Sequence, residues 1–302
     1  MTPSISRQQP DRQTVLALAA SIEAEDGAPP LSDQALAQLD RGNVTHLLAR
    51  DGAAVVGYAQ LDGESLEIAA RADAVPGLLA AAGDGPLLVW SHGRRSRVVG
   101  SLEQARFVRE RELHQLRRPL DADHPVPADP PLADDITVRA FVAGQDDAAW
   151  LALNAAAFAH HPEQGGWDER DLEARMAEPW FDPAGFLLAE RDGELLGFHW
   201  TKVHDTAPSD GAQPDGAQPD GAQPDGAQPD GPLGEVYVLG VSPQAQGLGL
   251  GRGLLVRGLR LLAGRGCPAV LLYVDGDNDA ALHLYAKDGF VTYDLDVQWR
   301  RG

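Results

Sequence analysis

The chain has 302 residues, of which 43% are hydrophobic, and it carries a formal net charge of -20 with a pI near 4.7. This length is too great for one small domain, and the composition excludes a largely disordered chain. A charge this negative argues against nucleic acid and anionic membranes as partners, because both require a basic protein surface. Solubility alone also accounts for the charge.

Features that report on location are few. Cys267 is the single cysteine, so the chain cannot form an intrachain disulfide. The first residues, MTPSISRQQPDRQ, lack the apolar core of a signal peptide, and no apolar run approaches the roughly 20 residues of a membrane span. We therefore expect a soluble, cytoplasmic protein.

Two segments recur in the same order, which predicts two copies of one domain. LLARDGAAVVGYAQ from Leu47 returns as LLAERDGELLGFHW from Leu187, and each is typical of a strand, an Asp-Gly turn and a second strand. FVRERELHQLRR from Phe107 returns as FVTYDLDVQWRR from Phe290, with Phe, Val, Gln, Arg and Arg at the same offsets.

The composition between the copies predicts the domain boundaries. Residues 119–135 are rich in proline and acidic side chains, which exclude a helix or a central strand. We expect an N-terminal domain over 1–118, a linker over 119–135 and a C-terminal domain over 136–302. Within the latter, DGAQP occurs four times in succession without any large apolar side chain, which predicts a disordered loop over 210–230.

The second copy alternates strands and helices, which predicts an α/β fold with a mixed central sheet flanked by helices. The expected strands are 136–142, 234–243, 269–277 and 290–300, the expected helices are 148–158, 172–180, 251–266 and 278–289, and the expected hairpin is 185–203.

A glycine-rich turn follows the strand expected at 234–243. Gly247, Gly249 and Gly251 permit close approach of a ligand to the backbone, and the amides at the start of the next helix favour a pyrophosphate. Arg252 and Leu254 stand where the dinucleotide fingerprint Gly-x-Gly-x-x-Gly requires glycine, and no Gly-Lys-Ser/Thr follows. These spacings disfavour a Rossmann site and a P-loop.

Gln246, Gly249 and Gly251 match the Gln/Arg-x-x-Gly-x-Gly motif of GNAT acetyltransferases, and Asn278 and Tyr285 stand at the family's spacing downstream, in NDAALHLYAKDGF. Taken singly, Asn278 is typical of a helix cap and Tyr285 of a core aromatic. The combination resembles the GNAT family. The resemblance implies two tandem GNAT domains, acetyl-CoA as co-substrate and no metal.

A finer resemblance, to the mycothiol synthase family, covers nearly the whole chain. It is carried by HPEQGGW from His161, FHWTK ending at Lys202, GEVYVLGVSPQAQGLGLGR, LLYV at 271–274 and LSDQAL at 31–36. It implies acetylation of the cysteinyl amine of cysteinyl-glucosaminyl-inositol. The implied substrate contacts are Asp33, Glu163, Lys202, Glu235 and Tyr273. The implied acetyl-CoA contacts are Leu239, Gly240, Val241, Gln246, Gly247, Leu248, Gly249, Leu250, Gly251, Arg252, Asn278, Asp279, Ala280, Ala281, Leu282 and His283.

The expected chemistry needs a base and an acid. Glu235 would accept the amine proton and Tyr285 would protonate the CoA sulfur. The first copy has no glycine motif in EIAARADAVPGLLAAAGDG at 67–85, so we expect one acetyl-CoA per chain, bound by the second copy of a monomer. Considered singly, the charged residues are also typical of a solvated surface, and Tyr273 of a core. Acetylation of another small-molecule or protein amine, and a non-catalytic acetyl-CoA sensor, stay open as alternatives.

Deleting residues 210–229 tests the interpretation of the repeat. A segment without large apolar side chains contributes nothing to a core, so we expect unchanged thermal stability and acetyl transfer. Differential scanning calorimetry and a steady-state assay of the deletion variant check this, and a large drop in the melting temperature would contradict it.

Overall fold

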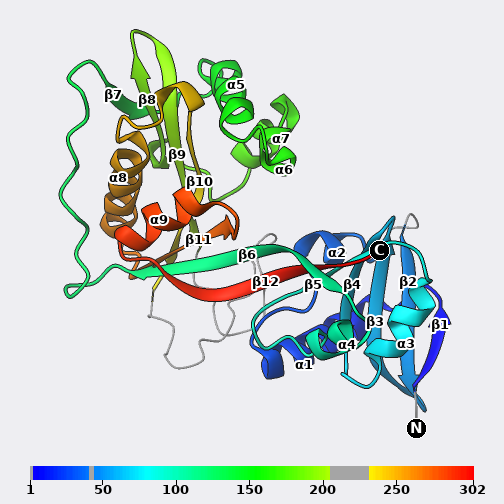
Figure 1. Ribbon diagram of the computed structural model, residues 1–302. Helices are drawn as coiled ribbons and strands as arrows, with labels where there is room; N and C mark the ends of the chain where they lie inside the picture. The colour runs from blue at the N-terminus through cyan, green and yellow to red at the C-terminus, as the bar shows by residue number, and fades with distance from the viewer. Residues whose placement is uncertain (1–2, 41–43, 205–230) are drawn as a thin grey trace.

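The computed structural model describes residues 3–40, 44–204 and 231–302, so the repeat predicted as a loop at 210–230 lies outside the described residues. The described strands form one mixed sheet in the order β1-β2-β3-β4-β5-β12-β6-β11-β10-β9-β8-β7 (Figure 1). The strands are β1 Ser4–Arg7, β2 Thr45–Asp51, β3 Ala54–Asp62, β4 Ser65–Ala70, β5 Leu87–Ser91, β6 Val108–Pro119, β7 Thr137–Ala140, β8 Phe186–Arg191, β9 Glu194–His204, β10 Leu233–Val241, β11 Ala269–Asp275 and β12 Val291–Arg301.

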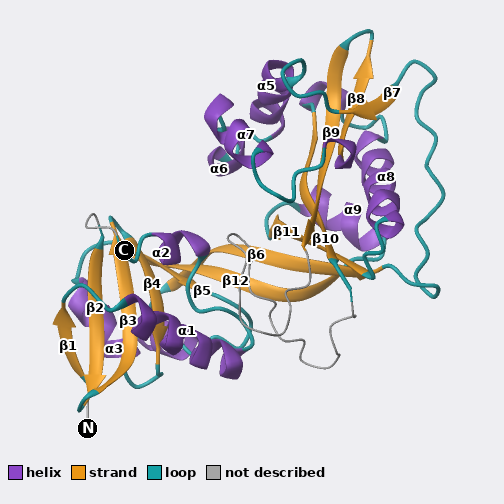
Figure 2. Cartoon of the chain, turned by 180° about the vertical axis from the view of Figure 1, so that it is seen from behind, coloured by secondary structure: helices purple, strands orange, loops and turns teal. Residues whose placement is uncertain are grey.

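Helices cover both faces of this sheet (Figure 2). They are α1 Arg12–Asp26, α2 Asp33–Ala37, α3 Val75–Ala82, α4 Val99–Gln104, α5 Asp147–Ala157, α6 Pro162–Gly165, α7 Glu169–Met176, α8 Leu250–Gly264 and α9 Asp279–Lys287, with short 3-10 helices η1 Pro183–Gly185 and η2 Pro243–Ala245. None of the helices in the described ranges has the length and apolar character that crossing a membrane requires. We call β1–β5 with α1–α4 the first lobe, and β7–β11 with α5–α9 the second lobe.

The two long strands β6 and β12 join the lobes (Figure 1). They pair with each other in antiparallel fashion, and β12 also pairs with β5 of the first lobe while β6 pairs with β11 of the second. Each copy's last strand therefore extends the other copy's sheet. The segments that recur at Phe107 and Phe290 in the sequence are the starts of these two strands.

The hydrophobic cores follow this exchange. Val297 and Trp299 of β12 are buried in the first lobe, in a cluster that includes Leu66, Leu78 and Leu102. In return, Leu116 of β6 is buried in the core of the second lobe under α8. Separation of the two lobes would therefore expose apolar side chains of both cores to water.

The tandem fold expected from the sequence is confirmed, and the local differences have physical causes. The helix expected over 172–180 is α7, which begins at Glu169 because Asp168 and Asp171 form a capping box. It ends at Met176, ahead of Pro179, whose ring disfavours helical geometry in the residue before it. The short helix α6 within HPEQG was not expected.

Trp299→Ala tests the exchanged packing. Trp299 is 2% exposed, and its indole Nε1–H donates to Ser91 Oγ at 2.9 Å. Truncation is expected to cost about 3–5 kcal/mol of unfolding free energy. Hydrogen exchange should accelerate at first-lobe amides, although Trp299 belongs to the second copy. Val291→Ala on the same strand, at a side chain 65% exposed, serves as the control and should change stability by less than about 0.5 kcal/mol. Protection unchanged in the first lobe would contradict the interlocked core.

Candidate active site

A pocket opens where β10 and β11 separate. These parallel strands pair only from Leu233 to Glu235, opposite residues 269–271, and β10 then shifts register between Val236 and Val238. The pocket beyond this point is lined from β10, β11 and α9, by Phe158, His161 and Gln164, and by Arg111 and Leu113 of β6. Such a gap between parallel strands exposes backbone amides that no neighbouring strand pairs.

The glycine turn lies at the start of α8. Gly247 and Gly249 have φ of 82° and 76°, values that L side chains rarely adopt, and open space lies where a Cβ would stand. Gly249 is the N-cap of α8 and provides no side chain to bond the first amides of the helix. The turn therefore fits a pyrophosphate, which would accept hydrogen bonds from these amides and face the positive end of the helix dipole.

Two side chains of this turn, Arg252 and Leu250, have other partners. Arg252 pairs with Asp288 at 2.9 Å, so its guanidinium is already engaged. Leu248 is exposed, and Leu250 is buried in the core that α8 forms with β8 and β9. A Cβ at Gly251 would make only ordinary contacts, with Leu284 at 3.6 Å and Val241 at 3.8 Å. The turn therefore offers a ligand its backbone amides and the exposed side chain of Gln246.

The other implied acetyl-CoA contacts fall on β10 and α9. Leu239, Asn278 and Ala281 line the pocket, whereas Gly240 and Val241 continue β10 opposite β9. Asn278 also caps α9, because its Oδ1 accepts the Ala281 amide at 3.1 Å. The remaining positions of the first turns of α9, which do not line the pocket, are Asp279, Ala280, Leu282 and His283.

Tyr285 projects from α9 into the pocket wall. Its side chain is 7% exposed and packs edge-on against Phe290 with the ring centroids 5.5 Å apart. Burial raises the pKa of Tyr285 above its ordinary value of 10. The phenol therefore stays protonated across the neutral range and can act only as a proton donor there.

Glu235 directly precedes Val236, the first residue of β10 that lines the pocket. It is 8% exposed, and its Oε2 contacts Nε2 of His204 at 2.7 Å. Lys202 stands opposite Glu235 in the register of β9 and β10. Its ammonium is 4.9 Å from the ring centre of Trp180 and 5.6 Å from that of Tyr237, within reach of cation–π attraction.

Tyr273 on β11 lines the same pocket, and its hydroxyl accepts a hydrogen bond from Gln115 Nε2 of β6 at 2.7 Å. Burial is the main cause that raises the pKa of Tyr273 above 10. The structure thus brings Leu239, Tyr273, Asn278, Ala281 and Tyr285 together around one pocket, and Glu235 precedes the lining segment of β10.

A polar group that the sequence analysis missed surrounds Asp275. Arg111 Nε donates to Asp275 Oδ1 at 2.6 Å, and His161 Nδ1 lies 3.3 Å from Asp275 Oδ2. Strand alternation carried a signal for Asp275, which is two residues after Tyr273 and so faces the same side of the sheet. Nothing in the sequence alone indicated that Arg111, from the first copy, would reach the pocket.

Asp33 and Glu163 are placed by their backbones only. Asp33 begins α2 and Glu163 lies within α6, and neither side chain is among those that the structure describes. In the described ranges, no group of three or more His, Cys, Asp or Glu side chains has a geometry that could hold a metal ion.

The corresponding helix of the first copy starts differently. α3 has Val75 and Pro76 as its first residues and Ala74 as its N-cap, with no side-chain hydrogen bond at the cap. Proline has no amide hydrogen, and Ala74 and Val75 are buried. The first copy therefore lacks the open glycine turn that precedes α8.

Comparison with known proteins agrees with this geometry. Residues 150–290 match the model of the acetyltransferase (GNAT) family. A GCN5-related N-acetyltransferase from Sphaerobacter thermophilus is similar in structure, with a TM-score of 0.67 at 19% identity over 98% of this chain and 95% of the other. A tandem GNAT protein from the clavulanic acid biosynthesis pathway aligns with a TM-score of 0.61 at 18% identity, over 99% of this chain and 98% of its own. The fold is that of a tandem GNAT acetyltransferase.

Sequence relatives define the family more closely. The mycothiol acetyltransferase of Streptomyces avermitilis is 47% identical over 306 aligned residues, which cover 95% of this chain and 91% of the relative. The chain belongs to the mycothiol acetyltransferase family. It is an acyltransferase, and GNAT acetyltransferases use acetyl-CoA as the acyl donor.

Gly249→Val tests the turn as the pyrophosphate site. A β-branched residue resists a φ of 76° and places methyl groups where the ligand would approach. We expect acetyl-CoA binding to fall below detection by isothermal titration calorimetry while the circular dichroism spectrum is unchanged. Gly264→Val, in open space at the other end of α8, is the matched control. Equal acetyl-CoA affinity in both variants would move the cofactor site elsewhere.

Proposed function

We propose that this chain transfers the acetyl group of acetyl-CoA to the cysteinyl amine of cysteinyl-glucosaminyl-inositol and thereby forms mycothiol. The observation that carries the proposal is the pocket between β10 and β11, which has Tyr285 in its wall. Glu235 directly precedes this pocket on β10, and the uncapped start of α8 follows the same strand in the chain. The reaction class follows from the family, and the substrate from the name of the relatives.

In this proposal the second lobe alone binds acetyl-CoA. The turn at 246–252 binds the pyrophosphate through its backbone amides. Residues 239–241 of β10 lie along one side of the pantetheine and acyl group, and the start of α9 at 278–283 lies along the other side. Bound acetyl-CoA supplies the thioester carbonyl that the amine attacks. An amide of the separated β10 edge is suited to polarise this carbonyl, because the edge beyond residue 236 has no pairing with β11.

Glu235 acts as the base. An α-amine has a pKa of about 8, so a fraction of the substrate amine is already neutral, and therefore nucleophilic, at neutral pH. As the nitrogen–carbon bond forms, the amine proton passes to the Glu235 carboxylate. The contact with His204, whose side chain is 19% exposed, gives the proton a route from the buried carboxylate toward solvent.

Tyr285 acts as the acid. When the carbon–sulfur bond breaks, the electron pair stays on sulfur, and the Tyr285 hydroxyl donates its proton there. The apolar surroundings that raise the Tyr285 pKa keep this proton in place until the thiolate develops. No covalent enzyme intermediate is needed, and the buried thiol of Cys267 takes no part.

The remaining assignments complete the proposal. Glu163, Lys202, Tyr273 and, from the first lobe, Asp33 contact the substrate, and the enzyme works as a cytoplasmic monomer with one acetyl-CoA per chain. The proposed domain boundaries at 118 and 136 divide the sequence into its two copies. They do not divide the sheet in the same way, because β6 and β12 each pair with a strand of the other copy. Acetylation of a different amine is the second candidate, and a panel of amines with mass spectrometric detection separates the two.

Glu235→Gln and Tyr285→Phe test the two proton-transfer roles. Each is expected to lower kcat by about 10²- to 10⁴-fold with an unchanged acetyl-CoA Kd, as loss of a general acid or base does. Glu235→Gln should recover part of its activity above pH 8, where the amine is already neutral. Glu194→Gln, in the exposed turn of the β8–β9 hairpin, is the control. A Glu235→Gln enzyme with the wild-type pH profile would remove Glu235 from the mechanism.

A further inference from the structure

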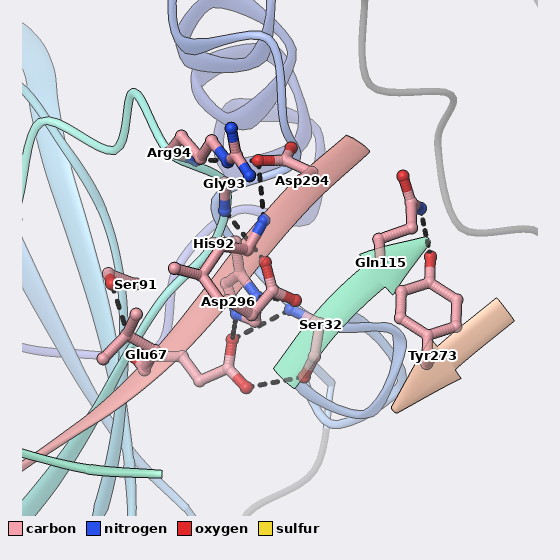
Figure 3. Close-up of polar contacts among 12 residues, drawn as sticks. Ser32, Glu67, Ser91, His92, Gly93, Arg94, Gln115, Tyr273, Asp294 and Asp296 are labelled. Carbon is pink, nitrogen blue, oxygen red and sulfur yellow. Dashed lines mark hydrogen bonds and ion pairs between the residues drawn. The ribbon is translucent and has the colours of Figure 1, made fainter. Parts of the chain in front are cut away.

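The first lobe contains a network of buried charges at the place equivalent to the pocket of the second. β4 and β5 pair in parallel only at Ser65 and Leu66 before they separate, as β10 and β11 do. His92 follows β5 and lies beyond this separation, between two carboxylates (Figure 3). Its Nε2 is 3.3 Å from Glu67 Oε2, and its Nδ1 is 3.3 Å from Asp296 Oδ2 of β12.

The network is charged and fixed. The His92 side chain is 14% exposed, and although burial opposes its charged form, the hydrogen bonds with Asp296 and Glu67 prevail and raise the pKa of His92 to about 10. Both ring nitrogens then donate. Glu67 also accepts from the amide and hydroxyl of Ser32, at 2.8 and 2.6 Å. Burial opposes its charged form, but His92 first and then Ser32 hold the pKa of Glu67 below the usual range.

Asp296 has acceptor capacity left. One of its oxygens faces His92, the other accepts the Gly93 amide at 2.9 Å, and the side chain is 20% exposed. A carboxylate offers about four lone-pair positions, so roughly half of them are still open. Two anionic side chains against one cation leave a net negative site, which suits hydroxyl donors and repels the phosphates of acetyl-CoA.

Strand pairing places this network on the sheet face that carries the pocket, and we call this face the wall. Asp296 lies directly opposite Leu113 of β6, which lines the pocket. Arg111 binds Asp275 at the pocket, and its guanidinium lies 5.8 Å from the ring centre of Trp90, which stacks on His92. Tyr273 pairs with Gln115, which pairs with Asp294, so Asp296, two residues further on, faces the same side of the sheet. The Asp296 charge also contributes to the raised pKa of Tyr273.

The span of the wall matches the proposed substrate. Glu235 and Asp296 stand three strands apart across β10, β11, β6 and β12, and the register of β11 with its neighbours offsets them by four residues along the strands. At about 4.8 Å per strand spacing and about 3.3 Å per residue, their backbones are roughly 20 Å apart. A cysteinyl group followed by two six-membered rings, together with the two carboxylate side chains, covers a similar length. The backbone of Asp33, the contact proposed for the first lobe, directly follows Ser32, which binds Glu67.

We propose that Asp296 binds the hydroxyl groups of the ring farthest from the reacting amine, and that His92 is a positioning residue that holds the Asp296 carboxylate. This inference rests on the proposed function for the identity of the amine end. The ligand class is a polyhydroxylated sugar or cyclitol ring. The degenerate copy thereby supplies the distal half of the substrate site, from the place where its own acyl-CoA pocket would be.

Asp296→Asn tests the proposal. Loss of one hydrogen bond to a charged group is expected to raise KM for cysteinyl-glucosaminyl-inositol roughly 10- to 100-fold. The kcat, the acetyl-CoA Kd and the kcat/KM for a cysteinyl amide without the rings should stay at the wild-type values. Asp40→Asn, at an exposed ion-paired carboxylate of the first lobe, is the matched control. Equal loss of kcat/KM with both substrates would show a merely structural role and overturn the proposal.

Two further variants test the same proposal if Asp296→Asn folds poorly. Asp296→Glu keeps the charge but moves the carboxylate by one methylene, and His92→Gln removes the cation that orients it. Both should show the same selective rise in KM, smaller than that of Asp296→Asn, without a change in kcat. A His92→Gln enzyme with unaltered KM would remove its positioning role.

A binding measurement separates this inference from the proposed function. Glucosaminyl-inositol, which lacks the cysteinyl amine, should bind the full-length wild-type chain in saturation-transfer NMR and lose its signal with Asp296→Asn. Binding without acetylation of the cysteinyl compound would refute the proposed function and leave the distal site standing. Absence of binding to the wild type, or equal binding to Asp296→Asn, would overturn the distal site itself.

Discussion

The antiparallel pairing of β6 with β12 is the constraint on which the rest of the structure depends. Each strand is the last of its own copy, yet each also pairs with the other copy's sheet, β12 with β5 and β6 with β11. The apolar residues of these strands are buried in opposite lobes, with Trp299 in the first and Leu116 in the second. Because main-chain hydrogen bonds and both cores depend on one pairing, the relative position of the lobes is set by register rather than by the linker.

This arrangement places unlike electrostatic environments at two ends of one surface. The start of α8 presents amides and a positive helix end, which suit the pyrophosphate of an acyl-CoA. Where β4 and β5 separate, the carboxylates of Glu67 and Asp296 flank His92. The net negative charge of this group disfavours a phosphate and suits hydroxyl groups. The two copies share a strand arrangement but differ in charge, so one ligand does not fit both.

The features that could be predicted from the sequence are those that short stretches of residues determine. Asp-Gly turns, the spacing of Gln246 to Gly251 and strand periodicity are local signals, and they predicted the hairpins, the glycine turn and most elements of the second copy. The exchange of β6 and β12 could not be predicted from the sequence. The hydrophobic pattern of a strand is the same whether it extends the sheet of its own copy or that of the other copy. Arg111 and Asp296 belong to the pocket and its extension only through that exchange. The repeat at Phe107 and Phe290 showed that the strands correspond, but not that they cross.

The same exchange gives the first copy, which lacks the glycine turn, a structural part in the site of the second. The first copy contributes β6, whose Leu113 and Arg111 line the pocket of the second, so that pocket would lack one wall without it. It also anchors β12, and with it Asp296, through the amide of Gly93 and the imidazolium of His92. A carboxylate held by a backbone amide and a buried cation loses little further entropy when it binds a ligand, which favours selection of a hydroxylated ring over water. Changes in these residues of the first copy would therefore alter the site of the second directly.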